Sequence, residues 1–178
     1  MRGRQVRVKV AAVVVLVVVG GLAMTGCGGG DDDDVVDGAG VELSDEAQIT
    51  YHYGDSSVPP EFHRSYTLTI GATEVHAVVD SYGDVLQDVT ADLPAEVWDN
   101  LVADAATVAA LGDEVDGDDE GCAGGTTRAL EIVDGGETVV DESFGVCCGA
   151  NEAPGQAFDG YIQPVLDAIP DWSTLVAT

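Results

Sequence analysis

Basic side chains are almost absent from most of this sequence. Four of the six lysine and arginine residues lie within the first nine positions, and beyond residue 27 only Arg64 and Arg128 face 33 acidic residues. The chain after residue 27 therefore has no lysine and a formal charge of −31. Nucleic-acid binding requires a basic surface, as does docking on anionic lipid headgroups. The composition excludes a nucleic-acid partner and argues against headgroup docking.

Motifs of common enzymes are also missing. The chain has no Gly-x-Ser-x-Gly elbow, no Gly-Lys-Ser/Thr phosphate loop and no His-Glu-x-x-His pair. Its three histidines, His52, His63 and His76, show no ligand spacing with the cysteines, so no zinc site is expected. We expect a protein that is not an enzyme, and a small enzyme of unknown class is the alternative.

The sequence lacks an apolar run that is long enough to cross a membrane. The apolar stretch from Val10 to Met24 has about 15 residues, whereas a spanning helix needs about 20. It follows a basic segment without acids, as in the central region of a secretory signal. Small residues and a cysteine close it: Thr25, Gly26 and Cys27.

Residues 1–27 resemble a type II, or lipoprotein, signal peptide. In that family a small residue precedes an invariant cysteine, which is diacylated before cleavage on its N-terminal side. The resemblance implies lipidation of Cys27 and an extracytoplasmic protein held on the cell membrane by its lipid. Met24 departs from the leucine that is usual in the family. An ordinary secreted protein, or one with a short uncleaved anchor, is the alternative.

A spacer follows the predicted signal peptide of residues 1–26. Residues 28–34 are three glycines and four aspartates, a composition that cannot bury enough apolar surface to fold and favours a solvated tether. We therefore predict a lipidated cysteine and tether over residues 27–43. Residues 44–178 then form one domain of about 135 residues, which is an ordinary domain size.

The acidic excess has two readings. Charge keeps a protein soluble where the ionic strength of the exterior screens self-repulsion, and we favour this reading. Calcium binding is the alternative, because calcium takes carboxylate oxygens. The acidic loop with Asp116, Asp118 and Glu120 is a weak candidate, as is the run Asp31–Asp34, and neither matches an EF-hand loop.

Three cysteines remain after Cys27. An exported chain sits in an oxidising compartment, where disulfides form. We predict that Cys122 pairs with Cys147 or Cys148, which closes a loop worth roughly 3 kcal/mol. A strained ring between Cys147 and Cys148 is the alternative, and the odd thiol is buried or pairs with another molecule.

Alternating residues predict strands in both halves of the domain. The first strand is expected over 47–53, and the clearest covers 62–70, with Phe62, Arg64, Tyr66, Leu68 and Ile70 on one face. A two-residue loop at Ala72-Thr73 would pair Ile70 with Val75 and Thr69 with His76. Further strands are expected through Val89, from Arg128 to Ile132, at Val139-Val140, and over 144–148.

Two segments show helical spacing. The first begins at Asp92-Leu93-Pro94 and ends at Gly112, with Trp98 in the core. The second runs from Phe158 to Ile169, and Pro164 within it should kink or restart the helix.

The predicted fold class is α+β, an antiparallel sheet with two helices on one face. A shift of 64 positions superposes the two halves without a gap and places Arg64 on Arg128. This suggests a duplicated β-β-α unit, although any two hairpin-plus-helix segments can be aligned in this way.

The two remaining arginines are the main candidate site residues. With acids in such excess, each is expected to pair with a carboxylate, and the candidates are Asp80, Asp84, Asp141 and Glu142. The alternative is that both arginines converge on one acidic ligand. We expect a lipid-tethered envelope module that binds or inhibits another envelope protein, or that has a structural role.

Overall fold

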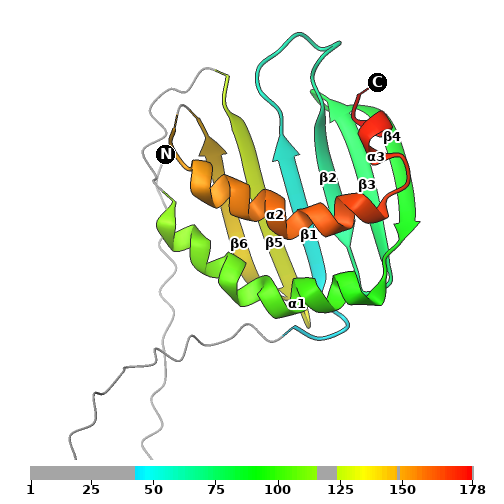
Figure 1. Cartoon of the computed structure of the whole chain (residues 1–178), viewed down its shortest axis with the longest axis vertical. Helices are drawn as coiled ribbons and strands as arrows, with labels where there is room; N and C mark the ends of the chain where they lie inside the picture. The colour runs from blue at the N-terminus through cyan, green and yellow to red at the C-terminus, as the bar shows by residue number, and fades with distance from the viewer. Residues whose placement is uncertain (1–42, 116–123, 148, 178) are drawn as a thin grey trace, which may run out of the picture. The chain divides into compact units, whose positions relative to one another are not determined.

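A six-stranded antiparallel sheet forms the centre of the folded chain, in the order β4-β3-β2-β1-β5-β6 (Figure 1). The computed structural model describes residues 43–115, 124–147 and 149–177. The elements are β1 (Gln48–Gly54), β2 (Ser65–Ile70), β3 (Glu74–Ser81), β4 (Asp84–Asp92), α1 (Ala95–Ala110), the short 3-10 helix η1 (Leu111–Glu114), β5 (Thr126–Asp134), β6 (Glu137–Val146), α2 (Glu152–Ala168) and α3 (Trp172–Leu175).

One face of this sheet carries the core. Alternate residues of each strand point toward α1 and α2, which cover that face and contact each other (Figure 1). Tyr51, Leu68 and Ile132 on this face are fully buried, as period-two alternation requires. The predicted α+β class, with helices on one face of an antiparallel sheet, is confirmed.

The hairpin of β2 and β3 has the predicted register. Ile70 pairs with Val75, Leu68 with Ala77 and Thr69 with His76. A slip by one residue would turn every apolar side chain of the hairpin toward solvent, so burial of one face fixes the pairing. Because this information is local, the register could be read from the sequence.

The predicted start of the second strand is wrong. β2 begins at Ser65 rather than Phe62. Phe62 and Arg64 therefore lie in the connection between β1 and β2, and the side chain of Phe62 is 68% exposed. The carboxylate of Asp55 bends this connection, since it accepts a hydrogen bond from the backbone N–H of Arg64 at 2.9 Å.

Both predicted helices form in the structure. α1 starts directly after Pro94 and buries Trp98, which is 4% exposed, as expected for a core residue. α2 starts six residues before Phe158, and Gly155 lets its first turn approach the side chain of Val146 in β6. The helix runs through Pro164 to Ala168 without the predicted restart.

The superposition by 64 residues does not hold residue by residue. It would pair Asp134 with Val139, whereas Asp134 pairs with Glu137 across a turn made by Gly135 and Gly136. Both glycines have positive φ, 57° and 83°, which suits a two-residue hairpin turn. In addition, Arg64 precedes its strand while Arg128 lies within β5, so the two arginines occupy different environments.

The helices α1, α2 and α3 and the short η1 are the helices of the described chain. Among these segments, none is long and apolar enough to cross a membrane. The predicted boundaries at residues 26 and 27 fall outside the described part of the chain, and the boundary at residue 43 falls on its first residue, so these boundaries stay predictions.

Candidate functional site

A half-buried ion pair connects the sheet to α2. Arg128 of β5 donates from Nε to Asp159 Oδ1 at 2.6 Å and from Nη2 to Asp159 Oδ2 at 2.9 Å. The hydroxyl of Tyr51 in β1 donates to the same Oδ1 at 2.8 Å. The carboxylate of Asp159 thus receives three hydrogen bonds, two of them in the planar geometry that arginine provides.

The two charges of this pair differ in their access to water. The side chain of Arg128 is 9% exposed and that of Asp159 is 45% exposed. Burial on its own lowers the pKa of Arg128, but the hydrogen bonds and the charge of Asp159 outweigh it and raise this pKa. Arg128 therefore stays charged, and Asp159 supplies its counter-charge.

Tyrosine rings surround the pair. The guanidinium carbon of Arg128 lies 4.4 Å from the centroid of the Tyr53 ring, a cation–π contact. Tyr53 stacks on Tyr66 with centroids 5.0 Å apart, and Tyr66 and Trp172 form a T-shaped pair with centroids 4.9 Å apart. These rings come from β1, β2 and α3, and they form a continuous aromatic array along one end of the sheet.

The hydroxyls of this array are held in the neutral form. Burial, together with the nearby Asp159 carboxylate, raises the pKa values of Tyr51 and Tyr66 above the ordinary tyrosine range. Burial also raises the pKa of Tyr53, to which the carboxylate of Asp55 adds. At neutral pH these side chains donate and accept hydrogen bonds and do not act as anionic nucleophiles.

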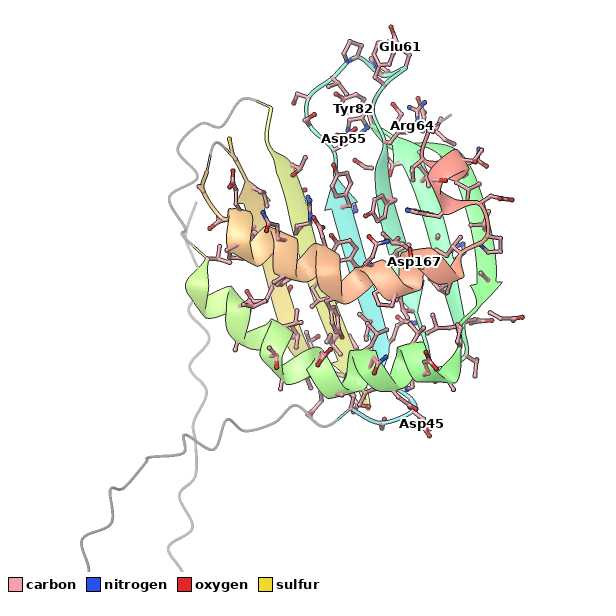
Figure 2. All side chains as sticks on the ribbon, in the orientation of Figure 1. Asp45, Asp55, Glu61, Arg64, Tyr82 and Asp167 are labelled. Carbon is pink, nitrogen blue, oxygen red and sulfur yellow. The ribbon has the colours of Figure 1, made fainter. Side chains whose placement is uncertain are left out.

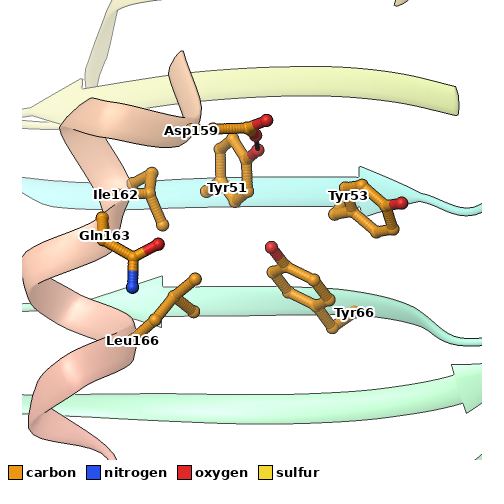
Figure 3. Close-up of a pocket in the computed structure, with 7 residues that line it drawn as sticks. All are labelled: Tyr51, Tyr53, Tyr66, Asp159, Ile162, Gln163 and Leu166. Carbon is orange, nitrogen blue, oxygen red and sulfur yellow. Dashed lines mark hydrogen bonds between the residues drawn. The ribbon is translucent and has the colours of Figure 1, made fainter. Parts of the chain in front are cut away.

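A pocket opens between α2 and the array. Its volume is about 220 Å³, and Figure 3 shows its walls. We call it the inner pocket, defined by Tyr51, Tyr53, Tyr66, Asp159, Ile162, Gln163 and Leu166. Three tyrosines and two aliphatic side chains line it together with one carboxylate and one amide, so it can accept part of a side chain together with a polar group.

A wider groove continues from the inner pocket and shares Tyr53 and Tyr66 with it. Its volume is about 410 Å³. We call it the aromatic groove, defined by Tyr53, Asp55, Phe62, Arg64, Tyr66, Trp172 and Val176. Four of these seven residues are aromatic, and the groove has one acid and one base. Aromatic residues and arginine dominate the binding energy of protein interfaces.

The connection between β1 and β2 forms one wall of the aromatic groove and is held by hydrogen bonds. Asp55 accepts from the backbone N–H of Ser56 at 2.7 Å as well as from that of Arg64. Tyr82 donates from its hydroxyl to the carbonyl oxygen of Val58 at 2.6 Å, and Ser81 donates to that of Pro60 at 2.8 Å. The loop is therefore braced against the β3–β4 turn before any ligand binds.

His63 lies under this loop and stacks on Tyr82. The two ring centroids are 3.8 Å apart, with 22° between the planes. His63 is buried, and its Nε2 lies 3.4 Å from Ser65 Oγ. His76 lies on the uncovered face of the sheet, where its Nε2 is 2.8 Å from Asp88 Oδ1.

The structure pairs Arg128 with a carboxylate that the sequence does not single out. Asp159 is its partner, and the predicted candidates lie elsewhere. Asp80 accepts from the backbone N–H of Gly83 in the β3–β4 turn, and Asp84 begins β4 beyond that turn. These predicted partners are wrong for Arg128, because the acid that faces it comes from a helix far along the chain.

The other two candidate partners lie on opposite faces of β6. Asp141 borders a shallow depression on the uncovered face of the sheet, beside Thr50 and His52. The carboxylate of Glu142 lies against Gly112 of η1, at the place where a side chain on residue 112 would sit. Neither position faces the guanidinium of Arg128, which is held by Asp159.

Arg64 makes a different set of contacts. Its guanidinium donates to the carbonyl oxygen of His63 at 2.6 Å and to that of Glu61 at 3.1 Å. The side chain closes its own loop and lines the aromatic groove. Arg64 and Arg128 approach the Tyr53–Tyr66 stack from different elements, and the acids on which they could converge, Asp55 and Asp159, belong to separate hydrogen-bond networks.

Several predicted sites fall outside the described residues. Cys27, Cys122 and Cys148 are among them, so the predicted lipidation and the disulfide with Cys147 or Cys148 stay predictions. The weak calcium candidates Asp116, Asp118 and Glu120 are also outside. Within the part of the chain that the structure describes, no three metal-ligating side chains cluster in an arrangement that could hold an ion.

Asp159, Tyr53 and Trp172 are the site residues that sequence reasoning missed. Asp159 could have been found, because it lies on the apolar stripe of α2, one turn before Ile162 and Gln163. An acid on a buried helical stripe needs a partner. Likewise, Tyr51 and Tyr53 share the buried face of β1, and a tyrosine hydroxyl on such a face needs a partner too.

The described side chains show no arrangement for covalent catalysis. The carboxylate of Asp159 is occupied by three donors, which makes it a poor general base. Ser65 and His63 lie close to each other, but both are buried, and Ser65 Oγ accepts a hydrogen bond from the backbone N–H of Asp55.

No protein-family model matches the chain, and no curated protein is similar to it.

Proposed function

We propose that the protein is a lipid-anchored envelope module that binds an extended segment of another envelope protein in the aromatic groove, without catalysis. The observation that carries the proposal is the groove itself, with four aromatic side chains on a braced loop, two strands and a short helix. Preorganised aromatic surfaces of this kind give affinity at low entropic cost.

The position of the groove supports this role. Asp45, close to the first described residue, lies at one end of the domain, whereas Asp55, Glu61, Arg64 and Tyr82 lie at the opposite end (Figure 2). The predicted tether joins the domain at the Asp45 end. If the domain is tethered at that end, the aromatic groove lies at the end away from the attachment point, where a partner can reach it.

The exposed side chains at the same end support an interface. Phe62 and Tyr82 are 68% and 57% exposed, and Val85 and Leu86 follow Tyr82 on the exposed start of β4. Large apolar side chains that gather at one end of a soluble domain are typical of interaction sites. Elsewhere in the described chain, the uncovered face of the sheet carries polar residues such as Thr69 and His76.

The anchor is tested separately from the groove. Replacing Cys27 with serine removes the atom that would carry the lipid, so we expect the protein to leave the membrane fraction and its precursor to accumulate. Fractionation of cells followed by immunoblotting measures both. Unchanged membrane retention would contradict the anchor and leave the groove proposal to be judged on its own test.

The groove is tested by photo-crosslinking in living cells. The photoreactive residue p-benzoylphenylalanine replaces Phe62, whose side chain is exposed, and in a matched control it replaces Thr69 on the uncovered face of the sheet. We expect a discrete protein adduct from position 62 and none from position 69. Equal adducts at both positions, or no adduct at position 62, would contradict the proposed function.

A further inference from the structure

We propose that the segment bound in the aromatic groove is cationic and presents arginine or lysine side chains to the aromatic rings. This inference rests on the proposed function, since it names the chemistry of the partner at that same site. It follows from the chemistry of the array, from the charges around the groove and from the charge of the chain as a whole.

The domain already contains the contact that we propose. Arg128 places its guanidinium over the Tyr53 ring, 4.4 Å from the centroid, and Asp159 neutralises it from the side. Tyr66 and Trp172 continue the same array into the groove. Electron-rich ring faces beside a carboxylate are the surroundings in which proteins hold a cation. A cation from a partner would meet further aromatic side chains, those of Phe62 and Trp172, beside the carboxylate of Asp55 in the groove.

The charges around the groove favour a cation. Asp55 lines the groove, Glu61 lies at the tip of its loop, and Asp171 precedes Trp172. Asp167 bonds Gln163 of the adjoining inner pocket at 2.8 Å. Arg64 is the basic residue that lines the groove, and its guanidinium holds backbone carbonyl oxygens of its own loop. The segments that form the groove and its borders therefore carry more acids than bases.

The chain as a whole adds to this preference. A formal charge of −31 beyond residue 27 attracts a basic segment over long range and repels an acidic one. Charge complementarity sets which partners approach, and the aromatic walls set where they bind. The expected occupant is thus an extended, basic stretch of protein with apolar residues between its cations, which Phe62 and Val176 can contact.

The experiment measures binding of three short fluorescent peptides to the chain from residue 27 onward, carrying Cys27→Ser to keep it in solution. The first peptide alternates arginine and leucine, the second has glutamine for arginine, and the third has glutamate for arginine. At an ionic strength of about 0.15 M, we expect the arginine peptide to bind at least about 10-fold more tightly than the glutamine peptide, and the glutamate peptide to bind least.

Variants separate the groove from diffuse attraction to an acidic protein. Trp172→Ala should weaken binding of the arginine peptide about 10-fold. The pair Asp167→Asn with Asp171→Asn should weaken it roughly 3-fold to 10-fold. The matched pair Glu96→Gln with Asp99→Asn removes the same charge from the exposed side of α1 and should change it less than about 2-fold. Circular dichroism verifies that each variant is folded.

Two outcomes would overturn the inference, and they differ from failure of the proposed function. If Trp172→Ala binds the arginine peptide as tightly as the parent, and both pairs of acid variants weaken it equally, the attraction is diffuse. If the glutamine peptide binds as tightly as the arginine peptide and depends on Trp172, the groove binds without preference for cations. In the second case the crosslink from position 62 still stands and the proposed function survives.

Discussion

Arg64 and Arg128 are the two arginines beyond residue 27, where the chain has no lysine, and they have different structural roles. Arg128 sits within β5, nearly buried, and joins the sheet to α2 through Asp159. Arg64 sits in a loop at the end of the sheet and donates to the backbone carbonyl oxygens of Glu61 and His63. A scarce residue type can thus support the fold at one position and shape a binding surface at the other.

The comparison also separates two kinds of carboxylate. Asp159 neutralises the buried guanidinium of Arg128, so it contributes to the free energy of unfolding. Asp55 accepts the backbone N–H groups of Ser56 and Arg64, so its role is to shape the loop that carries Phe62. Variants at the two sites should therefore divide into those that change the free energy of unfolding and those that change binding.

The largest effect is expected from Asp159→Asn. This change leaves the buried guanidinium of Arg128 without its counter-charge, and we expect the free energy of unfolding to fall by about 3 kcal/mol. Arg128→Met leaves only a half-exposed carboxylate that water can reach, so its expected loss is smaller, about 1–2 kcal/mol. Urea unfolding of both single variants and the double variant measures this. If Asp159→Asn left the free energy of unfolding unchanged, the ion pair would not stabilise the packing of α2 on the sheet.

The next effect is a loss of stability in alkali that depends on Tyr51. Its pKa is raised in the folded state, and an unfolded tyrosine ionises near pH 10. The contribution of the protonated Tyr51 hydroxyl to the free energy of unfolding is therefore complete below about pH 10, and it is lost as the pH rises beyond that value. In Tyr51→Phe, the free energy of unfolding should fall less steeply between about pH 9 and pH 11. Identical slopes in the two proteins would contradict the raised pKa.

A smaller effect on stability is expected from Arg64→Gln. The variant removes hydrogen bonds to two carbonyl oxygens at the surface, and we expect a loss of about 1 kcal/mol. Binding of the arginine peptide should be retained or improved, because a positive charge leaves the groove. If this variant lost as much stability as Asp159→Asn, the proposed division of work between the two arginines would be wrong.

The sequence was sufficient to predict those features of the fold that depend on residues close together in the chain. The register of β2 and β3 follows from the alternation of apolar residues and one short turn, and α1 follows from its apolar stripe. The start of β2 could not be read in this way, because Arg64 and Phe62 continue the alternation while Asp55 bends the backbone into a loop.

The site could be predicted only in part. The sequence indicates that Arg128 needs a carboxylate, but with 33 acids available it does not indicate which one. Asp159 lies 31 residues further along the chain, and only the packing of α2 on the sheet brings it to Arg128. Similarly, Trp172 reaches Tyr66 because α3 folds back over the end of the sheet, a placement that no local pattern encodes.

The two tryptophans offer the most direct test of the central claim. Trp98 is buried in the core, while Trp172 lines the aromatic groove. In a heteronuclear NMR titration with the arginine peptide, the indole N–H signal of Trp172 should shift and that of Trp98 should stay in place. The backbone signals of Phe62 and Arg64 should move with Trp172. If both indole signals stay fixed while the peptide binds, the aromatic groove is not the binding site.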